Sequence, residues 1–203
     1  MKKHFLSLMA VFFLLSCNPI MKKMYGIKDP ELESEKGIKK SALKNDMDTS
    51  NIVTVYSRVY PKMLKGRSIP DASIYDSRGN YIEYRQSDTS CNAGLFEFIP
   101  NLNVDTKYNQ PDSSNLSVEL FKFRDLKGNP IKEVEKADFY VLIYWAVWTG
   151  KLNKNHVKVW EDLAKNNKNC RVKVIKVNLD FQEHWDIADQ EIIVGSAKKK
   201  KMK

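Results

Sequence analysis

Residues 139–145, Phe-Tyr-Val-Leu-Ile-Tyr-Trp, form a continuous apolar run. Aromatic and β-branched residues dominate this run and no charged residue interrupts it. Such a run predicts a strand that is buried on both faces, as in the middle of a parallel sheet. Gly150 follows the run and opens a predicted helix, in which large residues recur at spacings of three and four.

The predicted helix is amphipathic and is expected to end near residues 166–169. The stripe expected to be buried consists of Leu152, His156, Val159, Trp160 and Leu163. The residues expected to face solvent are Lys154, Lys158, Glu161 and Lys165. A second strand is predicted at residues 172–179. Strand, helix and strand within about forty residues predict a right-handed parallel βαβ unit, and therefore an α/β fold.

The segment that joins the first strand to the helix, residues 144–152, reads Tyr-Trp-Ala-Val-Trp-Thr-Gly-Lys-Leu. It resembles the active site of the thioredoxin-like superfamily, in which a strand ending in Phe/Tyr-Trp-Ala leads into Trp-Cys-Gly-Pro-Cys and a helix. Thr149 and Leu152 stand at the two cysteine positions, and Lys151 replaces the proline. Disulfide exchange requires a thiolate that forms a mixed disulfide. The resemblance therefore implies a redox-inactive thioredoxin-like domain with no catalytic residue and no cofactor.

The resemblance covers about residues 119–183. Residues 178–180, Asn-Leu-Asp, are similar to the Val-Asn-x-Asp ending of the family's strand after the active-site helix. Residues 121–132 resemble the β-hairpin that precedes the core in membrane-anchored members. The family continues with an Ile/Val-Pro-Thr loop whose proline is cis, then a hairpin and a helix. Only 23 residues follow Asp180, and they contain no proline.

A counterpart of these missing elements lies upstream. Ile69-Pro70 precedes an alternating strand, an Asp-x-x-Gly turn and a second strand, and residues 91–102 are expected to form the closing helix. One interpretation is a circularly permuted, thioredoxin-like mixed sheet with flanking helices. The strand from Asp71 then runs antiparallel to residues 141–144, and Pro70, after a cis bond, lies beside Thr149. The other interpretation is an unrelated hairpin appended to a truncated domain.

Under the permuted interpretation, two distant stretches rebuild the peptide-binding edge of a thioredoxin. The residues predicted to form this edge are Trp148, Thr149, Gly150, Lys151, Ile69 and Pro70.

The N-terminus resembles a bacterial lipoprotein signal peptide. Lys2 and Lys3 precede an apolar run at residues 5–15, which ends in Leu-Leu-Ser before Cys17. The run is too short to span a bilayer. We expect cleavage before Cys17, acylation of this cysteine (palmitate among its chains) and stable membrane anchoring by several acyl chains. The alternative is an ordinary secretory signal with an incidental cysteine. By the family's rule, Asn18 is compatible with sorting to the outer membrane, facing the periplasm.

These features divide the chain into five regions. They are a signal peptide (1–16), a lipidated tether with a possible short helix (17–50), a hairpin-plus-helix region (51–118), a thioredoxin-like βαβ core (119–190) and a basic tail (191–203). The net charge is +9, of which the signal's two lysines and the tail's five account for seven. The nearly balanced body argues against nucleic-acid binding. The tail is either a solvated end or a contact for anionic lipid or envelope polymer.

Two cysteines remain after lipidation of Cys17. An even pair in an oxidising envelope invites a disulfide, but the permuted fold places Cys91 and Cys170 at opposite ends of the sheet, beyond the ~7 Å that a disulfide tolerates between Cα atoms. Cys91 is then either a reactive thiol at a helix start or a small buried hydrophobe. His156 is expected to pack at the core. The acids around His184 lack ligand spacing, so no metal site is predicted.

Three functions follow from these observations. The first is a non-catalytic envelope lipoprotein that binds or scaffolds an unknown envelope protein or peptide. The second is a thiol-disulfide oxidoreductase that uses Cys91 with an external thiol. The third is a purely structural envelope component.

Overall fold

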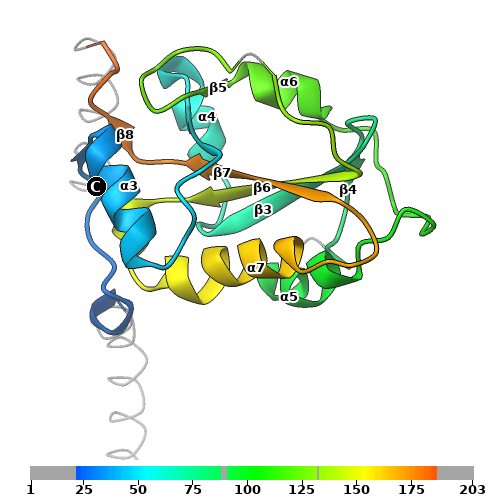
Figure 1. Cartoon of the computed structure of the whole chain (residues 1–203). Helices are drawn as coiled ribbons and strands as arrows, with labels where there is room; N and C mark the ends of the chain where they lie inside the picture. Colours follow the sequence, from blue (N-terminus) through cyan, green and yellow to red (C-terminus); the bar gives the residue numbers. More distant parts are fainter. Residues whose placement is uncertain (1–21, 88–90, 132, 187–203) are drawn as a thin grey trace, which may run out of the picture.

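The structure, a computed structural model, describes residues 22–87, 91–131 and 133–186. Its centre is a six-stranded mixed sheet in the order β4-β3-β6-β7-β2-β5, with helices on both faces (Figure 1). The predicted α/β fold with a mixed sheet and flanking helices is confirmed. The predicted signal peptide, Cys17 and the basic tail lie outside the described residues.

The strands are β1 (Leu32–Glu33), β2 (Ile52–Val55), β3 (Asp71–Asp76), β4 (Tyr81–Ile82), β5 (Phe123–Arg124), β6 (Phe139–Trp145), β7 (Val172–Asn178) and β8 (Phe181–Gln182). The α-helices are α3 (Glu35–Lys44), α4 (Tyr60–Leu64), α5 (Leu95–Phe98), α6 (Leu116–Phe121) and α7 (Val159–Lys165). Short helical turns of other types are η1 (Ser57–Val59), η2 (Asn92–Gly94), η3 (Ile99–Asn101), η4 (Val147–Thr149) and η5 (Asn153–Lys158).

The apolar strand β6 lies in the middle of the sheet and is buried along its whole length. It pairs in parallel with β7 over seven positions, so the predicted parallel βαβ unit is confirmed. Successive side chains of a strand point to opposite faces. Ile143 and Trp145 pack in the core cluster that contains residues of α5 and α7. Leu142 and Tyr144 pack with residues of α4 and α6 on the other face.

The pairing of β3 with β6 is antiparallel, as the permuted interpretation predicts. Asp71 lies opposite Tyr144 at the end of β6 from which the helix departs. The bond between Ile69 and Pro70 is cis, and the helical turns η2, α5 and η3 cover residues 92–101 as expected. The hairpin is therefore part of the main sheet rather than an appendage. Strand β2, beyond β7, also comes from upstream of this hairpin.

A tight turn joins β3 to β4. Gly79 adopts φ +85°, a conformation that glycine reaches without steric cost. The Asp76 carboxylate accepts hydrogen bonds from the backbone N–H groups of Arg78 and Asn80, at 2.9 and 2.8 Å. Strand β5 belongs to the expected hairpin at residues 121–132, but its main partner is β2.

The helix that follows β6 begins with the π-helical turn η5 and continues as α7 to Lys165. Its buried stripe is displaced by one residue from the predicted one. The buried residues are Asn153, Val157, Trp160, Glu161 and Ala164. The prediction that Glu161 faces solvent is wrong, because its carboxylate forms a 2.6 Å ion pair with Lys176 of β7. Asn153 is drawn inward by hydrogen bonds to the loop after β6.

Residues 22–50, expected to form a tether with a short helix, contain the helix α3 and contact the rest of the domain through β1 and α3. Strand β1 pairs in parallel with β8, and α3 buries Ile38 and Ala42 in the main core. Ser34 caps α3 through its hydroxyl, which accepts a hydrogen bond from the Gly37 N–H. Apolar residues four apart on α3 give this segment a face that the core can bury.

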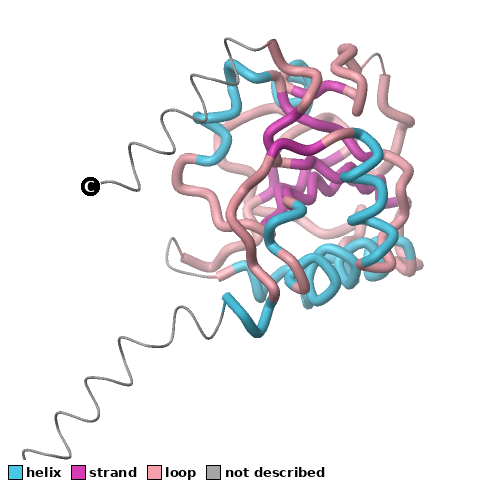
Figure 2. Tube along the Cα trace, turned by 90° about the vertical axis from the view of Figure 1, so that its left-hand side faces the viewer, coloured by secondary structure: helices cyan, strands magenta, loops and turns pink. Residues whose placement is uncertain are grey.

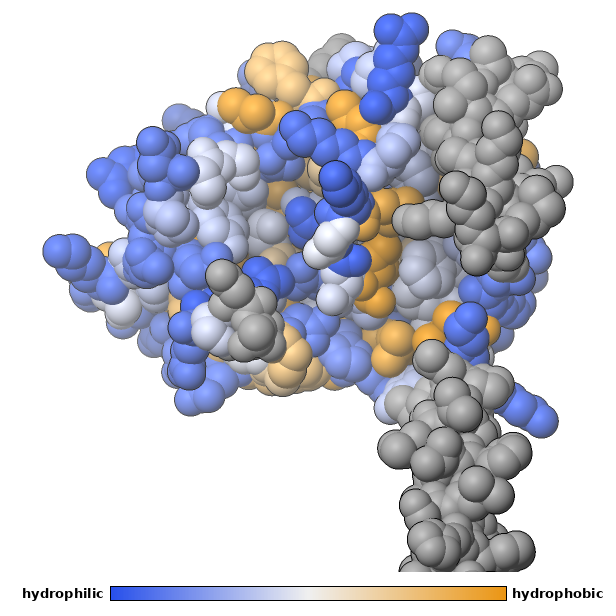
Figure 3. Space-filling model, turned by 180° about the vertical axis from the view of Figure 1, so that it is seen from behind, coloured by the Kyte–Doolittle hydropathy of each residue, from blue (hydrophilic) through white to orange (hydrophobic). Residues whose placement is uncertain are grey.

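The strands of the six-stranded sheet form a twisted layer between helices (Figure 2). Seen from behind, the surface is mainly hydrophilic, and hydrophobic residues are seen in small groups (Figure 3). Within the described ranges, no helix combines the length and the apolar character that a membrane span requires.

Candidate functional site

The loop after β6 contains the two positions that correspond to reactive cysteines. Thr149 is 1% exposed, and its hydroxyl lies 2.7 Å from the Ala146 carbonyl oxygen and 2.8 Å from Oδ1 of Asn153. The Asn153 amide also donates to the Ala146 carbonyl. Leu152 is half-buried. This closed network holds the start of the helix and contains no thiol.

The same loop is covered by the chain's own N-terminal segment. The backbone N–H of Lys28 donates to the Trp148 carbonyl at 2.9 Å, and the N–H of Lys151 donates to the Tyr25 carbonyl at 2.7 Å. Gly150, at φ +61°, permits this approach, since a Cβ atom there would overlap the carbonyl oxygens of Tyr25 and Gly26. The predicted peptide-binding edge therefore holds residues 25–28.

The cis-proline residues lie at the same end of the sheet as this loop. Pro70 directly precedes Asp71, which pairs with the end of β6. Pro70 is buried, and its carbonyl accepts a 2.6 Å hydrogen bond from Asn92, while Ile69 packs against the core on the α4 side. No hydrogen bond joins either residue to residues 148–151 within the described ranges. The residues predicted to form the edge therefore lie at one end of the sheet. Among them, Trp148 and Lys151 form main-chain hydrogen bonds with residues 25–28.

A buried carboxylate lies beneath the loop. Asp180 is 1% exposed, and its Oδ2 accepts hydrogen bonds from the Val147 N–H and the Asn178 side chain, both at 2.7 Å. Its Oδ1 is buried as well, and the backbone N–H of Trp148 also interacts with this carboxylate. Burial raises the pKa of Asp180 to about 7, so this group titrates near neutral pH. The sequence identified the Asn-Leu-Asp ending but not the titratable role of the acid.

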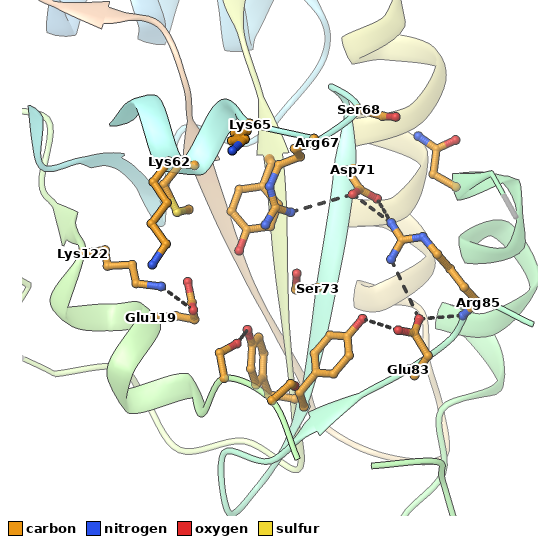
Figure 4. Close-up of a pocket in the computed structure, with 18 of the residues that line it drawn as sticks. Lys62, Lys65, Arg67, Ser68, Asp71, Ser73, Glu83, Arg85, Glu119 and Lys122 are labelled. Carbon is orange, nitrogen blue, oxygen red and sulfur yellow. Dashed lines mark hydrogen bonds and ion pairs between the residues drawn. The ribbon is translucent and has the colours of Figure 1, made fainter. Parts of the chain in front are cut away.

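A cavity of about 810 Å³ lies beside the cis-proline, on the sheet face that carries α4 and α6. Charged side chains from α4, the loop before β3, β3 itself and α6 point into it (Figure 4). Little in the sequence indicates this cavity, because its lining residues come from five separate stretches, 59–75, 81–85, 91–92, 113–122 and 144. The one local signal was a pair of opposite charges, Arg67 and Asp71, on either side of the cis-proline.

Asp71 is the centre of the charge cluster on one wall of the cavity. It is 5% exposed, and both of its oxygens lie 2.9 Å from Nη2 of Arg85. The Tyr84 hydroxyl donates to it at 3.1 Å. Arg67 lies 3.8 Å away and stacks over the Tyr144 ring, with 3.7 Å from its Cζ atom to the ring centroid. Both guanidinium groups are therefore held in fixed positions.

The two remaining cysteines are free. Cys91 is exposed and lies at the rim of the cavity. Cys170 precedes β7 at the opposite end of the sheet, and its thiol lies 3.2 Å from the Leu102 carbonyl oxygen. Burial raises the pKa of Cys170. The expected separation of the pair agrees with this placement.

His156 and His184 are both partly buried. His156 is half-buried and its ring packs against Phe96 and Trp160, as predicted. Burial lowers the pKa of His184. No group of His, Cys, Asp and Glu within the described ranges has an arrangement that could hold a metal ion.

Comparison of the chain with protein-family models, with curated proteins and with solved structures gives no significant match.

Proposed function

We propose that the protein is a non-catalytic binding module of thioredoxin-like architecture, held at the bacterial cell envelope by lipid on Cys17. The N-terminal pattern of Lys2, Lys3, an apolar run and Leu-Leu-Ser-Cys supports export and lipidation. The α/β sheet with a cis-proline beside the end of β6 supports the architecture. The enclosed hydroxyl of Thr149 supports the absence of thiol chemistry.

The observation that carries the binding role is the contact between residues 25–28 and residues 148–151. Two main-chain hydrogen bonds hold the N-terminal segment on the loop. An edge with free main-chain groups binds peptides by such bonds, and side chains then add specificity. We infer that an extended segment of an envelope protein takes the place of residues 25–28 when it binds.

Site-specific photo-crosslinking tests this role. With a photoreactive residue at the exposed position of Lys151, we expect adducts to an envelope protein in intact cells. Gly150→Ala should reduce their yield about tenfold, because the new Cβ projects into the space of the peptide backbone. Gly66→Ala is the matched control, since Gly66 also has positive φ but nothing within 4 Å of a Cβ. Equal yields from the two variants, or no adducts at all, would reject the edge as the binding site.

A second candidate function is thiol chemistry at Cys91, favoured by the exposure of this thiol at the cavity rim. We expect the purified protein not to reduce insulin disulfides, because Thr149 and Leu152 cannot carry a mixed disulfide. The assay compares wild type with Cys91→Ser and Cys170→Ser. Turnover that disappears only in Cys91→Ser would establish the second candidate instead.

A further inference from the structure

The cavity beside the cis-proline has a surplus of positive charge. Its basic lining residues are Lys62, Lys65, Arg67, Arg85 and Lys122, and its acidic ones are Asp71, Glu83 and Glu119. Glu119 is 2.6 Å from Lys122, and Asp71 is occupied by the two arginines. Lys62 and Lys65 form no ion pair with any described residue. A concave site lined by excess charge of one sign attracts and concentrates ligands of the opposite sign.

One buried polar group at this cavity, Nε of Arg67, has no hydrogen-bond partner within the described part of the chain. The hydroxyl of Tyr144, a fully buried side chain, interacts with the side chain of Ser73. A buried donor without a partner is destabilising. Since Arg67 lines the cavity, an acceptor bound there would be positioned to satisfy its Nε.

The fixed geometry of the wall suits recognition of an oxyanion. Asp71 holds Arg85 through a two-oxygen contact, and Arg67 is held between Asp71 and the Tyr144 ring. A preorganised guanidinium group loses little side-chain freedom when it binds carboxylate or phosphate. The volume of about 810 Å³ lies in the range of small-molecule sites.

We propose that this cavity binds a small organic anion, whose phosphate or carboxylate group contacts Arg67, Lys62 and Lys65. Ser73, Ser114 and three tyrosines also line the cavity, so the rest of the ligand is expected to carry hydroxyl groups. This site goes beyond the peptide edge of the proposed function, because it lies on the α4 and α6 side of the sheet and uses different residues.

Isothermal titration calorimetry on the purified full-length chain tests the proposal. The probes are glycerol 3-phosphate, gluconate as the carboxylate and glycerol as the neutral control, all at constant ionic strength. We expect saturable binding of at least one anion and none of glycerol, and the stronger anion identifies the headgroup. The variant Lys62→Ala/Lys65→Ala should bind at least tenfold more weakly, while Lys168→Ala, an exposed lysine outside the cavity, should bind like wild type.

Two further variants separate recognition from folding. Arg67→Lys keeps the positive charge but removes the planar set of guanidinium N–H donors. Tyr144→Phe removes only the hydroxyl. Each should weaken anion binding several-fold while the circular dichroism spectrum stays that of wild type. The proposal fails if neither anion binds saturably at millimolar concentration, or if the double lysine variant binds as tightly as wild type.

Discussion

Replacing Lys176 by alanine is expected to lower the free energy of unfolding by about 3 to 5 kcal/mol. Lys176 and Glu161 are each only 1% exposed, and their charged atoms are 2.6 Å apart. Removing the lysine leaves a carboxylate buried between helix and sheet. Its other neighbours, the Asp48 N–H at 3.1 Å and Lys165 at 3.7 Å, neutralise it only in part. Urea unfolding followed by circular dichroism measures the effect.

The matched control is Lys173→Ala on the same strand. Lys173 pairs with Glu135 at 2.8 Å, but Glu135 is largely exposed, and ion pairs of this kind contribute about 0 to 1 kcal/mol. The double replacement Glu161→Leu/Lys176→Met should unfold closer to wild type than either single change, because no buried charge remains. A loss of less than about 1 kcal/mol in Lys176→Ala would contradict the buried pair.

The parts of the fold that the sequence predicted are those specified by local pattern. The apolar residues of β6 are consecutive rather than alternating, which predicts a strand that is buried on both faces. The β3–β4 hairpin carries its own turn chemistry, with Asp76 three residues before a glycine of positive φ. The cis-proline position followed from a resemblance at Ile69-Pro70, and the structure bears it out.

What the sequence did not predict depends on pairings between distant elements. The helical pattern predicted that Glu161 faces solvent, because such a pattern contains no information about residues outside the helix. Its ion-pair partner, Lys176, lies on β7. The polar composition of residues 22–50 predicted a tether. In the structure, apolar residues of this segment such as Ile38 pack in the main core. The cavity joins residues of α4, β3, β6 and α6, and no spacing along the chain brings these together.

Burial of Asp180 is expected to make the protein less stable as the pH rises from about 4 to about 7. The pKa of this acid is raised from 3.8 to about 7 in the folded state. Between these values the folded protein binds the proton and the unfolded chain does not. This contribution to stability is therefore fully present below the unfolded pKa and is lost as pH rises through the folded one.

The variant Asp180→Asn isolates this contribution, because an amide does not titrate. The stability of the variant relative to wild type is expected to increase by about 4 kcal/mol between pH 4 and pH 8, at about 1.4 kcal/mol for each unit of pKa difference. Any change in the free energy of unfolding that the new amide causes independently of pH cancels in this comparison. Urea unfolding at both pH values measures it, with the exposed Asp105→Asn as the control for the substitution. A relative stability that stays constant or falls with pH would mean that Asp180 is already ionised below neutral pH, with its bonds to Val147 and Asn178 outweighing its burial.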